Sequence, residues 1–169
     1  TETNGVSYID NFSWSPDGKK VAFIGEGERS GNKKYSGNLK VANIETGEIK
    51  DLGIMAMLPK WSPDNKYVFF KDAIAYRTKK GNVTSVEYRG SAKIKRVNIE
   101  TGSIGTVFNS RSYDSYAFSP GGKYLIAYKN YDFGKTNVFI ADVEKSLIVK
   151  KFKSDNSIQK IYWHFLKDR

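Results

Sequence analysis

Three short stretches of the chain are almost continuously apolar: VAFI at 21–24, YVFF at 67–70 and YLIAY at 124–128. A strand with one solvent-exposed face alternates apolar and polar residues, whereas a strand covered on both faces reads as a solid apolar run. The pattern therefore predicts three inner strands, each covered on both faces by other parts of the structure.

The same short phrase precedes each apolar run. Trp14, Trp61 and Phe118 are followed by SPDG, SPDN and SPGG, respectively. Proline presets φ at the first corner of a turn, and aspartate can bond its own backbone. Glycine, and to a lesser degree asparagine, tolerates the positive φ that closes the turn. We therefore expect a tight turn here, with Asn65 and Gly122 in the conformation of Gly18.

A second phrase repeats in step with the first. NIETG occurs at 43–47 and again at 98–102, and DVEKS takes the third place at 142–146. The spacing between the two phrases differs from unit to unit, so one loop within each unit is free to vary. The expected first strands are 9–14, 57–61 and 115–118, and the expected fourth strands are 49–52, 104–108 and 148–152.

Units of four antiparallel strands and about 45 residues, with inner strands covered on both faces, are typical of β-propeller blades. The sequence thus predicts an all-β chain, one segment over 1–169, with blades at about 8–52, 57–108 and 113–152. The side chains expected between blades are Trp14, Phe23, Trp61, Phe69, Phe118 and Ile126.

The combination of W-S-P-D-G-K, an apolar strand and a hairpin ending in N-I-E-T-G resembles the WD-like propeller repeat of the TolB family. The same repeat occurs in the propeller domains of prolyl oligopeptidase and dipeptidyl peptidase relatives. The resemblance covers residues 8 to about 152. It implies a propeller fold and says little about function.

Three blades do not close a ring, because propellers have four to eight. Residues 158–165 are expected to form the first strand of a fourth blade. Three explanations are open: a fragment of a longer propeller, two copies that complete a six-bladed ring by self-association, or an open stack of blades.

The formal net charge is +10, which attracts acidic or anionic partners. The basic residues are scattered, so a general compositional bias also explains the surplus. No recognition motif for nucleic acid is present, and no stretch is long and apolar enough for a membrane span. Cysteine is absent. Together with the resemblance, this absence favours a periplasmic or extracellular location.

The chemistry of catalysis is missing from the sequence. The single histidine, His164, cannot form a multi-histidine metal site, and no G-x-S-x-G segment marks a hydrolase nucleophile. Asp17 and Asp64 are explained as turn residues, since Gly121 replaces them in the third repeat. We therefore expect no catalytic residue, no metal site, no cofactor and no enzymatic activity.

The variable loops, at 26–37 and 71–93, are expected to form the working surface. They hold nine basic and four acidic residues. Residues 74–88 read as a hairpin extension with strands on either side of Lys-Lys-Gly-Asn. The connection between the first two blades, 53–58, is expected to add apolar surface on the same rim. The candidate partner-binding residues are Arg29, Lys33, Lys34, Tyr76, Arg77, Lys79, Lys80, Tyr88, Arg89 and Met55.

Two functions are consistent with these features. The first is a non-catalytic scaffold or binding module that meets a protein partner on the loop-bearing face. The second is the substrate-gating propeller of a larger hydrolase whose catalytic domain is absent from this chain.

Overall fold

The computed structural model describes residues 9–26, 37–80, 83–109, 114–131 and 134–156 of the 169. Within these ranges the chain forms antiparallel β-strands and no α-helix, which confirms the predicted all-β class. The strands are β1 (Ile9–Trp14), β2 (Lys20–Glu26), β3 (Gly37–Asn43), β4 (Ile49–Trp61), β5 (Tyr67–Lys80), β6 (Val83–Asn98), β7 (Ile104–Asn109), β8 (Ser115–Phe118), β9 (Tyr124–Asn130), β10 (Thr136–Asp142) and β11 (Leu147–Ser154).

The strands pair in chain order within two sheets, β1 to β7 in one and β8 to β11 in the other. The seven-stranded sheet contains two blades because β4 serves both. Its first part pairs with β3 and closes blade 1, and its last part pairs with β5 and opens blade 2. Blade 3 consists of β8 to β11. The predicted strand at 158–165 and His164 lie outside the described residues.

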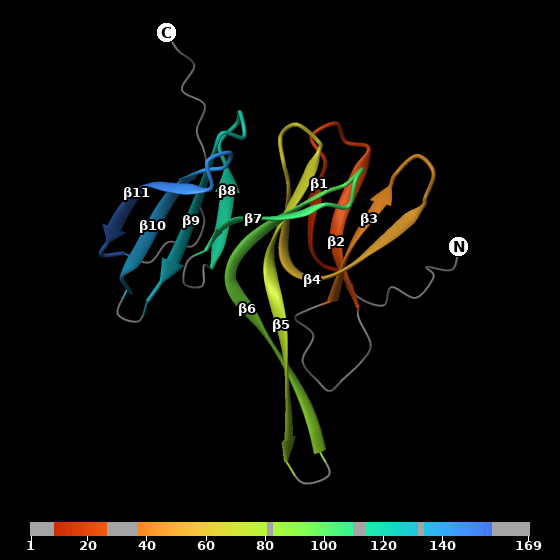
Figure 1. Ribbon diagram of the computed structural model, residues 1–169, viewed down its shortest axis with the longest axis horizontal. Coiled ribbons are helices and arrows are strands. Elements are labelled where there is room, and N and C mark those ends of the chain that lie inside the picture. The colour runs from red at the N-terminus through yellow and green to blue at the C-terminus, as the bar shows by residue number, and fades with distance from the viewer. Residues whose placement is uncertain (1–8, 27–36, 81–82, 110–113, 132–133, 157–169) are drawn as a thin grey trace.

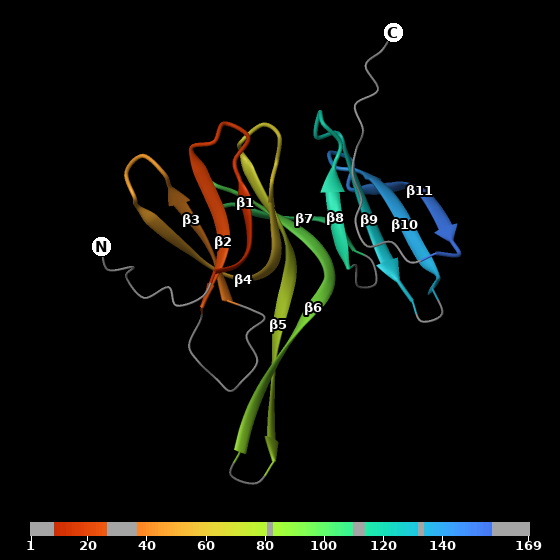
Figure 2. The ribbon, with the colours of Figure 1, turned by 180° about the vertical axis from the view of Figure 1, so that it is seen from behind.

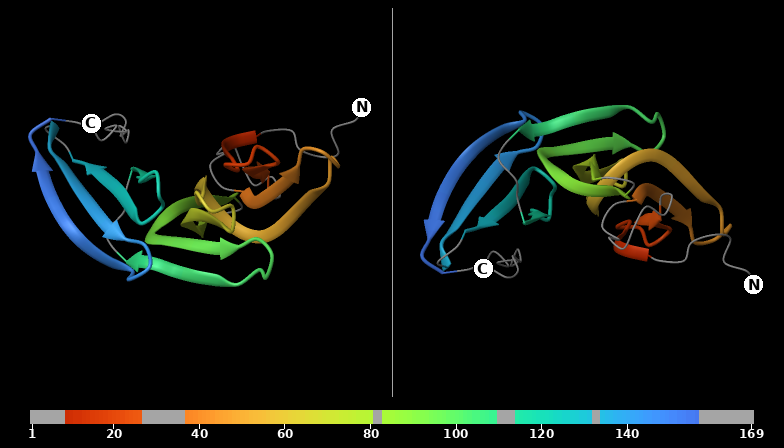
Figure 3. Two further views of the ribbon diagram at one scale, coloured as in Figure 1. Left: turned by 90° about the horizontal axis from the view of Figure 1, so that it is seen from above. Right: turned by 90° about the horizontal axis from the view of Figure 1, so that it is seen from below.

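The blades are arranged side by side in an arc. Figure 3 shows a crescent, with β1 and β8 on the concave side and β7 and β11 on the convex side. The first strand of each blade is therefore nearest the centre of curvature. This order is what adjoining propeller blades require.

The Ser-Pro turns have the predicted conformation. Gly18, Asn65 and Gly122 adopt φ of 72°, 60° and 72°. In the first turn the Ser15 hydroxyl donates to Asp17 Oδ1 at 2.6 Å and accepts from the Lys20 backbone N–H at 2.8 Å. The second turn repeats both bonds, and the third keeps the serine bond to the backbone.

The second repeated phrase forms the turn between the third and fourth strands of each blade. Asn43 Oδ1 accepts hydrogen bonds from the backbone N–H groups of Glu45 and Thr46, two and three residues further along the chain, at 2.9 and 3.2 Å. Asn98 and Asp142 do the same in blades 2 and 3. The first residue of the phrase therefore fixes this turn through its side-chain oxygen.

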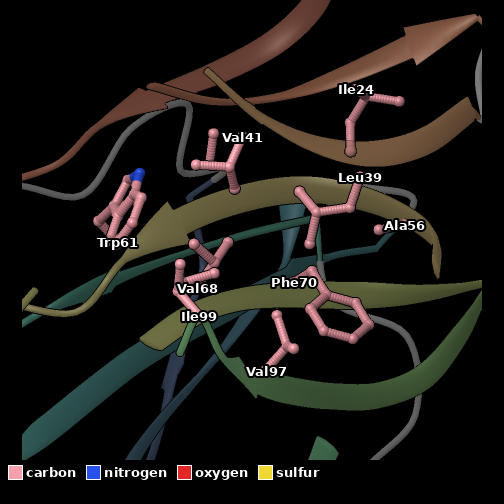
Figure 4. Close-up of a cluster of buried hydrophobic side chains, with 10 residues drawn as sticks. Ile24, Leu39, Val41, Ala56, Trp61, Val68, Phe70, Val97 and Ile99 are labelled. Carbon is pink, nitrogen blue, oxygen red and sulfur yellow. The ribbon is translucent and has the colours of Figure 1, made fainter. Parts of the chain in front are cut away.

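Buried apolar side chains form two clusters, one between each pair of neighbouring blades. The first cluster lies between blades 1 and 2 and includes Ala22, Leu39, Trp61 and Phe70 (Figure 4). The second lies between blades 2 and 3 and includes Phe69, Ile94, Tyr116 and Leu125. In β5, Val68, Phe69 and Phe70 are all buried, so this strand is covered on both faces as predicted.

The predicted core between blades is confirmed at Trp61 and Phe69, which belong to the two clusters. Phe23 is buried but belongs to neither cluster, and Phe118 and Ile126 are only partly buried. The prediction is wrong at Trp14, whose side chain is 54% exposed. Trp14 occupies the face of blade 1 that points away from blade 2, and no described residue covers it as blade 1 covers Trp61.

The segment 53–58 also differs from the prediction. The sequence predicts a connection between blades at 53–58, with a new strand beginning at Met57, but all of these residues continue β4 without a break. Positive φ angles at Gly53 (65°) and Leu58 (52°) redirect the strand from one blade to the next.

Candidate binding surface

The most distinctive feature of the fold is the length of β5 and β6. The corresponding strands of blades 1 and 3 have 7 residues each, whereas β5 has 14 and β6 has 16. β4 pairs with β5 as far as Asp72, and β7 pairs with β6 as far as Lys93. Residues 73–80 and 83–90 therefore pair with each other as a two-stranded ribbon, here called the hairpin extension.

The hairpin extension leaves the blades at a β-bulge. Lys71 pairs with Ile94 and Ala73 pairs with Gly90, so β6 contributes two more residues than β5 between these pairs. A bulge of this kind bends a strand and increases its twist. Figures 1 and 2 show the extension projecting beyond the body of the blades, at the end opposite the Ser-Pro turns. The predicted extension is thus confirmed.

The strand register divides the candidate residues of the extension between its two faces. Tyr88 pairs with Ala75, and Arg77 and Lys79 follow at alternate positions of β5, so these residues belong to one face. Tyr76, Lys80 and Arg89 occupy the alternate register and belong to the other face. Each face therefore holds one tyrosine and two basic positions. Arg29, Lys33 and Lys34 lie outside the described residues.

Met55 lies at the root of the extension. It pairs with Asn38, and the next residue of β4, Ala56, pairs with Asp72, where the extension begins. The Met55 side chain is half-buried. The end of the blades from which the extension projects is called here the insertion rim. It consists of residues 53–58, the root of the extension, and Tyr131 and Lys135 between β9 and β10.

Charged side chains cluster at the root of the extension. Lys95 Nζ lies 2.9 Å from Asp72 Oδ2, and Lys129 Nζ lies 2.9 Å from Asp114 Oδ1. Burial lowers the pKa of the Lys71 amino group, the negative charge of Asp114 opposes that shift, and the Lys129 charge adds to it. Each of these two ion pairs lies within one blade, Lys95–Asp72 in blade 2 and Lys129–Asp114 in blade 3.

The sequence pattern did not single out Lys95 and Lys129, because each lies on a strand of its blade rather than in a variable loop. A signal was available at Asp114. It stands four residues before Phe118, as Asp10 stands four residues before Trp14. In two of the three blades, the position four residues before the end of the first strand is therefore acidic and lies on the insertion rim.

Blade 3 adds an open hollow of about 410 Å³ to the same rim. Its lining is polar or charged at most positions: Tyr131, Lys135, Thr136, Asn137, Lys153, Ser154 and Asp155. The Thr136 hydroxyl is already engaged, since it donates to Asn130 Oδ1 at 2.6 Å. The hollow thus offers charged and polar groups to a partner, while the larger part of its exposed lining is apolar surface of these side chains.

The turn aspartates are occupied with backbone structure. The Ser15 hydroxyl and the Lys19 backbone N–H both donate to the Asp17 carboxylate, and these hydrogen bonds lower its pKa. Asp64 accepts the equivalent bonds from Ser62 and Lys66. Within the described part of the chain, no group of three or more histidine, aspartate and glutamate side chains is placed to hold a metal ion. No described helix is long and apolar enough to cross a membrane.

Comparison with solved structures identifies the arrangement. Acylaminoacyl peptidase from Pyrococcus horikoshii matches with a TM-score of 0.62 at 18% identity, over 87% of this chain and 25% of that one. The propeller domain of the Trilobed protease from Pyrococcus furiosus matches with a TM-score of 0.60 at 20% identity, over 88% and 43%. The fold is that of a β-propeller.

A putative TolB from Agrobacterium tumefaciens also matches, with a TM-score of 0.55 at 19% identity over 90% of this chain and 51% of that one. The chain spans between a quarter and about half of the length of these three proteins. At this level of identity the likeness establishes the fold alone. No protein-family model matches the sequence, and neither does any curated protein.

Proposed function

We propose that this chain is a non-catalytic propeller module that binds an acidic protein partner on the insertion rim. The observation that carries the proposal is the hairpin extension. In the part of the chain that the structure describes, its two strands pair only with each other beyond Asp72 and Lys93, so it adds no strand pairing to the described blades. An isolated two-stranded ribbon is marginally stable in water, and we attribute its length to binding.

The hairpin extension can bind an extended segment of a partner protein by strand addition. Both of its outer edges offer backbone N–H and C=O groups, and a partner strand can add to such an edge. Side chains at alternate positions then give specificity. Arg77 and Lys79 on one face, and Lys80 and Arg89 on the other, favour a partner rich in aspartate and glutamate.

A deletion can test the role of the extension without disturbing the blades. Ala73 and Gly90 are cross-strand partners, so Asn-Gly can replace residues 74–89 as a two-residue hairpin turn. A peptide display selection on the intact chain should enrich acidic sequences. These peptides should lose binding to the deletion variant, whose melting temperature should remain close to that of the parent chain.

The charge itself is tested by the triple substitution Arg77→Glu, Lys79→Glu and Lys80→Glu. It should slow association of the enriched peptides, and raising the salt concentration should weaken binding to the parent chain, because the Debye length falls from about 10 Å at 0.1 M to about 3 Å at 1 M. Peptides that bind parent, triple variant and deletion variant equally would place the working surface elsewhere.

A second candidate function is the propeller part of a larger hydrolase. The peptidase names of two matched structures support it, as does the fact that the chain covers only a quarter of the acylaminoacyl peptidase. Under both proposals this chain alone turns over no peptide, ester or glycoside substrate. Turnover abolished by one substitution within the chain would overturn that expectation.

A further inference from the structure

The outer strand of blade 3, β11, differs in charge from the outer strands of the other two blades. It holds Lys150, Lys151 and Lys153 and no acidic residue. The outer segment of blade 1, residues 49–52 of β4, holds one lysine and one aspartate, and β7 of blade 2 holds no charged residue. Among the three outer strands, β11 alone is therefore strongly basic.

The lysines of β11 are exposed, and the ion pairs of the described residues involve none of them. Two of them lie near aromatic rings instead. Lys150 Nζ is 5.1 Å from the centroid of the Phe152 ring, and Lys151 Nζ is 6.0 Å from that of Phe139. Their ammonium groups therefore present positive charge to solvent, and an anionic partner can approach it.

The same strand exposes three large apolar side chains. Leu147, Val149 and Phe152 are 58%, 49% and 40% exposed. Lys150 and Ile148 pair with consecutive residues of β10, so Val149 is the extra residue of a β-bulge. A bulge takes a side chain out of the regular alternation of a strand. Apolar and basic side chains are therefore interspersed along one exposed strand.

The exposure of β11 comes from its place on the perimeter of the fold. Figure 3 shows β7 and β11 on the convex side of the crescent. Ile49 and Ile104, at the beginning of the outer segments of blades 1 and 2, are 48% and 53% exposed, although both blades pack against a neighbour. An outer strand thus stays accessible when another blade adjoins its blade.

We propose that β11 docks on the surface of a lipid bilayer that contains anionic phospholipids. The lysine ammonium groups bind the headgroup phosphates, and Leu147, Val149 and Phe152 enter the boundary between headgroups and acyl chains. The long stems of the lysines let their charges remain among the headgroups while these apolar neighbours go deeper. A nucleic acid would engage the lysines but leave the exposed aliphatic side chains without a role, so the mixed surface favours lipid.

The charge of the other blades confines the contact to blade 3. Glu45, Glu48 and Asp51 are exposed around the outer segment of blade 1, and Glu100 is exposed in the turn before β7. An anionic surface repels these carboxylates, so blades 1 and 2 turn away from it. The contact therefore has one orientation, with the outer strand of blade 3 against the bilayer.

Cosedimentation with vesicles tests the role of the lysines. The chain should bind vesicles of phosphatidylcholine with an equal part of phosphatidylglycerol, and not vesicles of phosphatidylcholine alone. Replacing Lys150, Lys151 and Lys153 together by glutamine should weaken binding by about 100-fold, since each lysine near an anionic surface contributes about five-fold. The matched control makes the same change of charge at one exposed lysine in each Ser-Pro turn and should bind nearly as the parent chain does: Lys19→Gln, Lys66→Gln and Lys123→Gln.

A second set of variants tests the apolar side chains. Leu147→Gln and Val149→Gln should each weaken vesicle binding by about five-fold, because less apolar surface is then buried. Ile49→Gln and Ile104→Gln, at exposed aliphatic residues of the other outer segments, are the controls and should leave it unchanged. Phe152→Trp adds a reporter, and its fluorescence, taken as the difference from the parent chain, should shift to shorter wavelength on anionic vesicles.

Several results would overturn the proposal. Equal loss of binding in the two triple lysine variants would assign binding to the net charge of the chain, and binding without the fluorescence shift would mean adsorption through charge alone. Binding to duplex DNA but not to anionic vesicles would assign the lysines to a soluble polyanion. Lysines on an outer strand also prevent pairing between strand edges, and a lysine variant that self-associates yet binds vesicles as the parent does would assign them that role. None of these comparisons changes the hairpin extension, so the two proposals fail separately.

Discussion

The hydroxyl of Tyr116 donates a hydrogen bond to the backbone carbonyl oxygen of Leu58, 2.6 Å away, and so ties blade 3 to the inner strand of blade 2. Leu58 holds a positive φ of 52°, which costs a bulky residue about 1 kcal/mol or more. The bond lies where β4 turns from one blade to the next. It therefore supports a strained position on which the stacking of two blades depends.

Removing this hydroxyl should destabilise the protein. Tyr116→Phe leaves the half-buried Leu58 carbonyl oxygen without that donor, and we expect a loss of about 1–2 kcal/mol of unfolding free energy. Chemical denaturation checks the value. Tyr124→Phe, at a half-buried tyrosine of the same blade, is the control and should have a smaller effect. Equal stability of Tyr116→Phe and the parent chain would contradict a role for the bond.

The same residue predicts how stability changes at high pH. Burial raises the pKa of the Tyr116 hydroxyl well above its ordinary value of about 10. The unfolded chain therefore loses this proton before the folded chain does, and stability should fall as the pH rises above about 10. Melting temperatures of the parent chain and Tyr116→Phe, measured between pH 8 and about 11, should show a shallower decline in the variant. Parallel declines would assign the effect to other groups.

Substitutions of Trp61 separate the contribution of packing to stability from that of hydrogen bonding. Trp61→Ala should cost about 3–5 kcal/mol, as large aromatic deletions in a core do. Trp61→Phe should cost much less, because the buried indole Nε1 has no hydrogen-bond partner among the described residues, and its removal recovers part of a desolvation penalty. Trp14→Ala, at an exposed equivalent position, should cost under about 1 kcal/mol. A large loss at Trp14 in the monomer would mean that this side chain is covered in solution.

Alanine substitutions at two glycines in equivalent turns should lower the stability by different amounts. Gly18 and Gly122 share a φ of 72°, so both substitutions place alanine in a left-handed backbone conformation, at a cost of about 1–2 kcal/mol. At Gly18 an added Cβ meets nothing within 4 Å, whereas at Gly122 it lies 3.1 Å from Pro63 Cδ of the neighbouring blade. Gly122→Ala should therefore lower the melting temperature more than Gly18→Ala. The reverse order would show that Gly122 and Pro63 do not touch.

Much of the fold could be predicted because each blade needs the same turns and the same apolar inner strand, and the sequence repeats these motifs. The Ser-Pro turns, the solid apolar runs and the hairpin extension follow from local chemistry, and the structure agrees with each. The prediction for Trp14 is wrong because a repeat specifies the kind of residue at a position and not whether a neighbouring blade is present. The continuation of β4 through 53–56 was not predicted, because two positive φ angles, one of them at Leu58, carry no clear sequence signal.

The candidate site was less predictable than the fold. Charge counting treats Arg77, Lys79, Lys80 and Arg89 as one patch, whereas the strand register places them on two faces. The ion pairs at the root of the extension depend on how the strands of each blade approach one another, as in Lys129 with Asp114. The repeat marks Asp114 as a polar residue four positions before Phe118, but nothing in the sequence identifies Lys129 as its partner.

Because blades 1 and 2 share β4, we expect them to unfold together. Blade 1 takes its outer strand and blade 2 its inner strand from one uninterrupted segment, Ile49–Trp61, whereas blade 3 shares no strand with either. Sub-global unfolding that frees β4 removes hydrogen bonds from both blades at once, so their amide protons should exchange with solvent as one cooperative unit. A proteolytic cut within this segment would dismantle two blades, and a cut between β7 and β8 would release one.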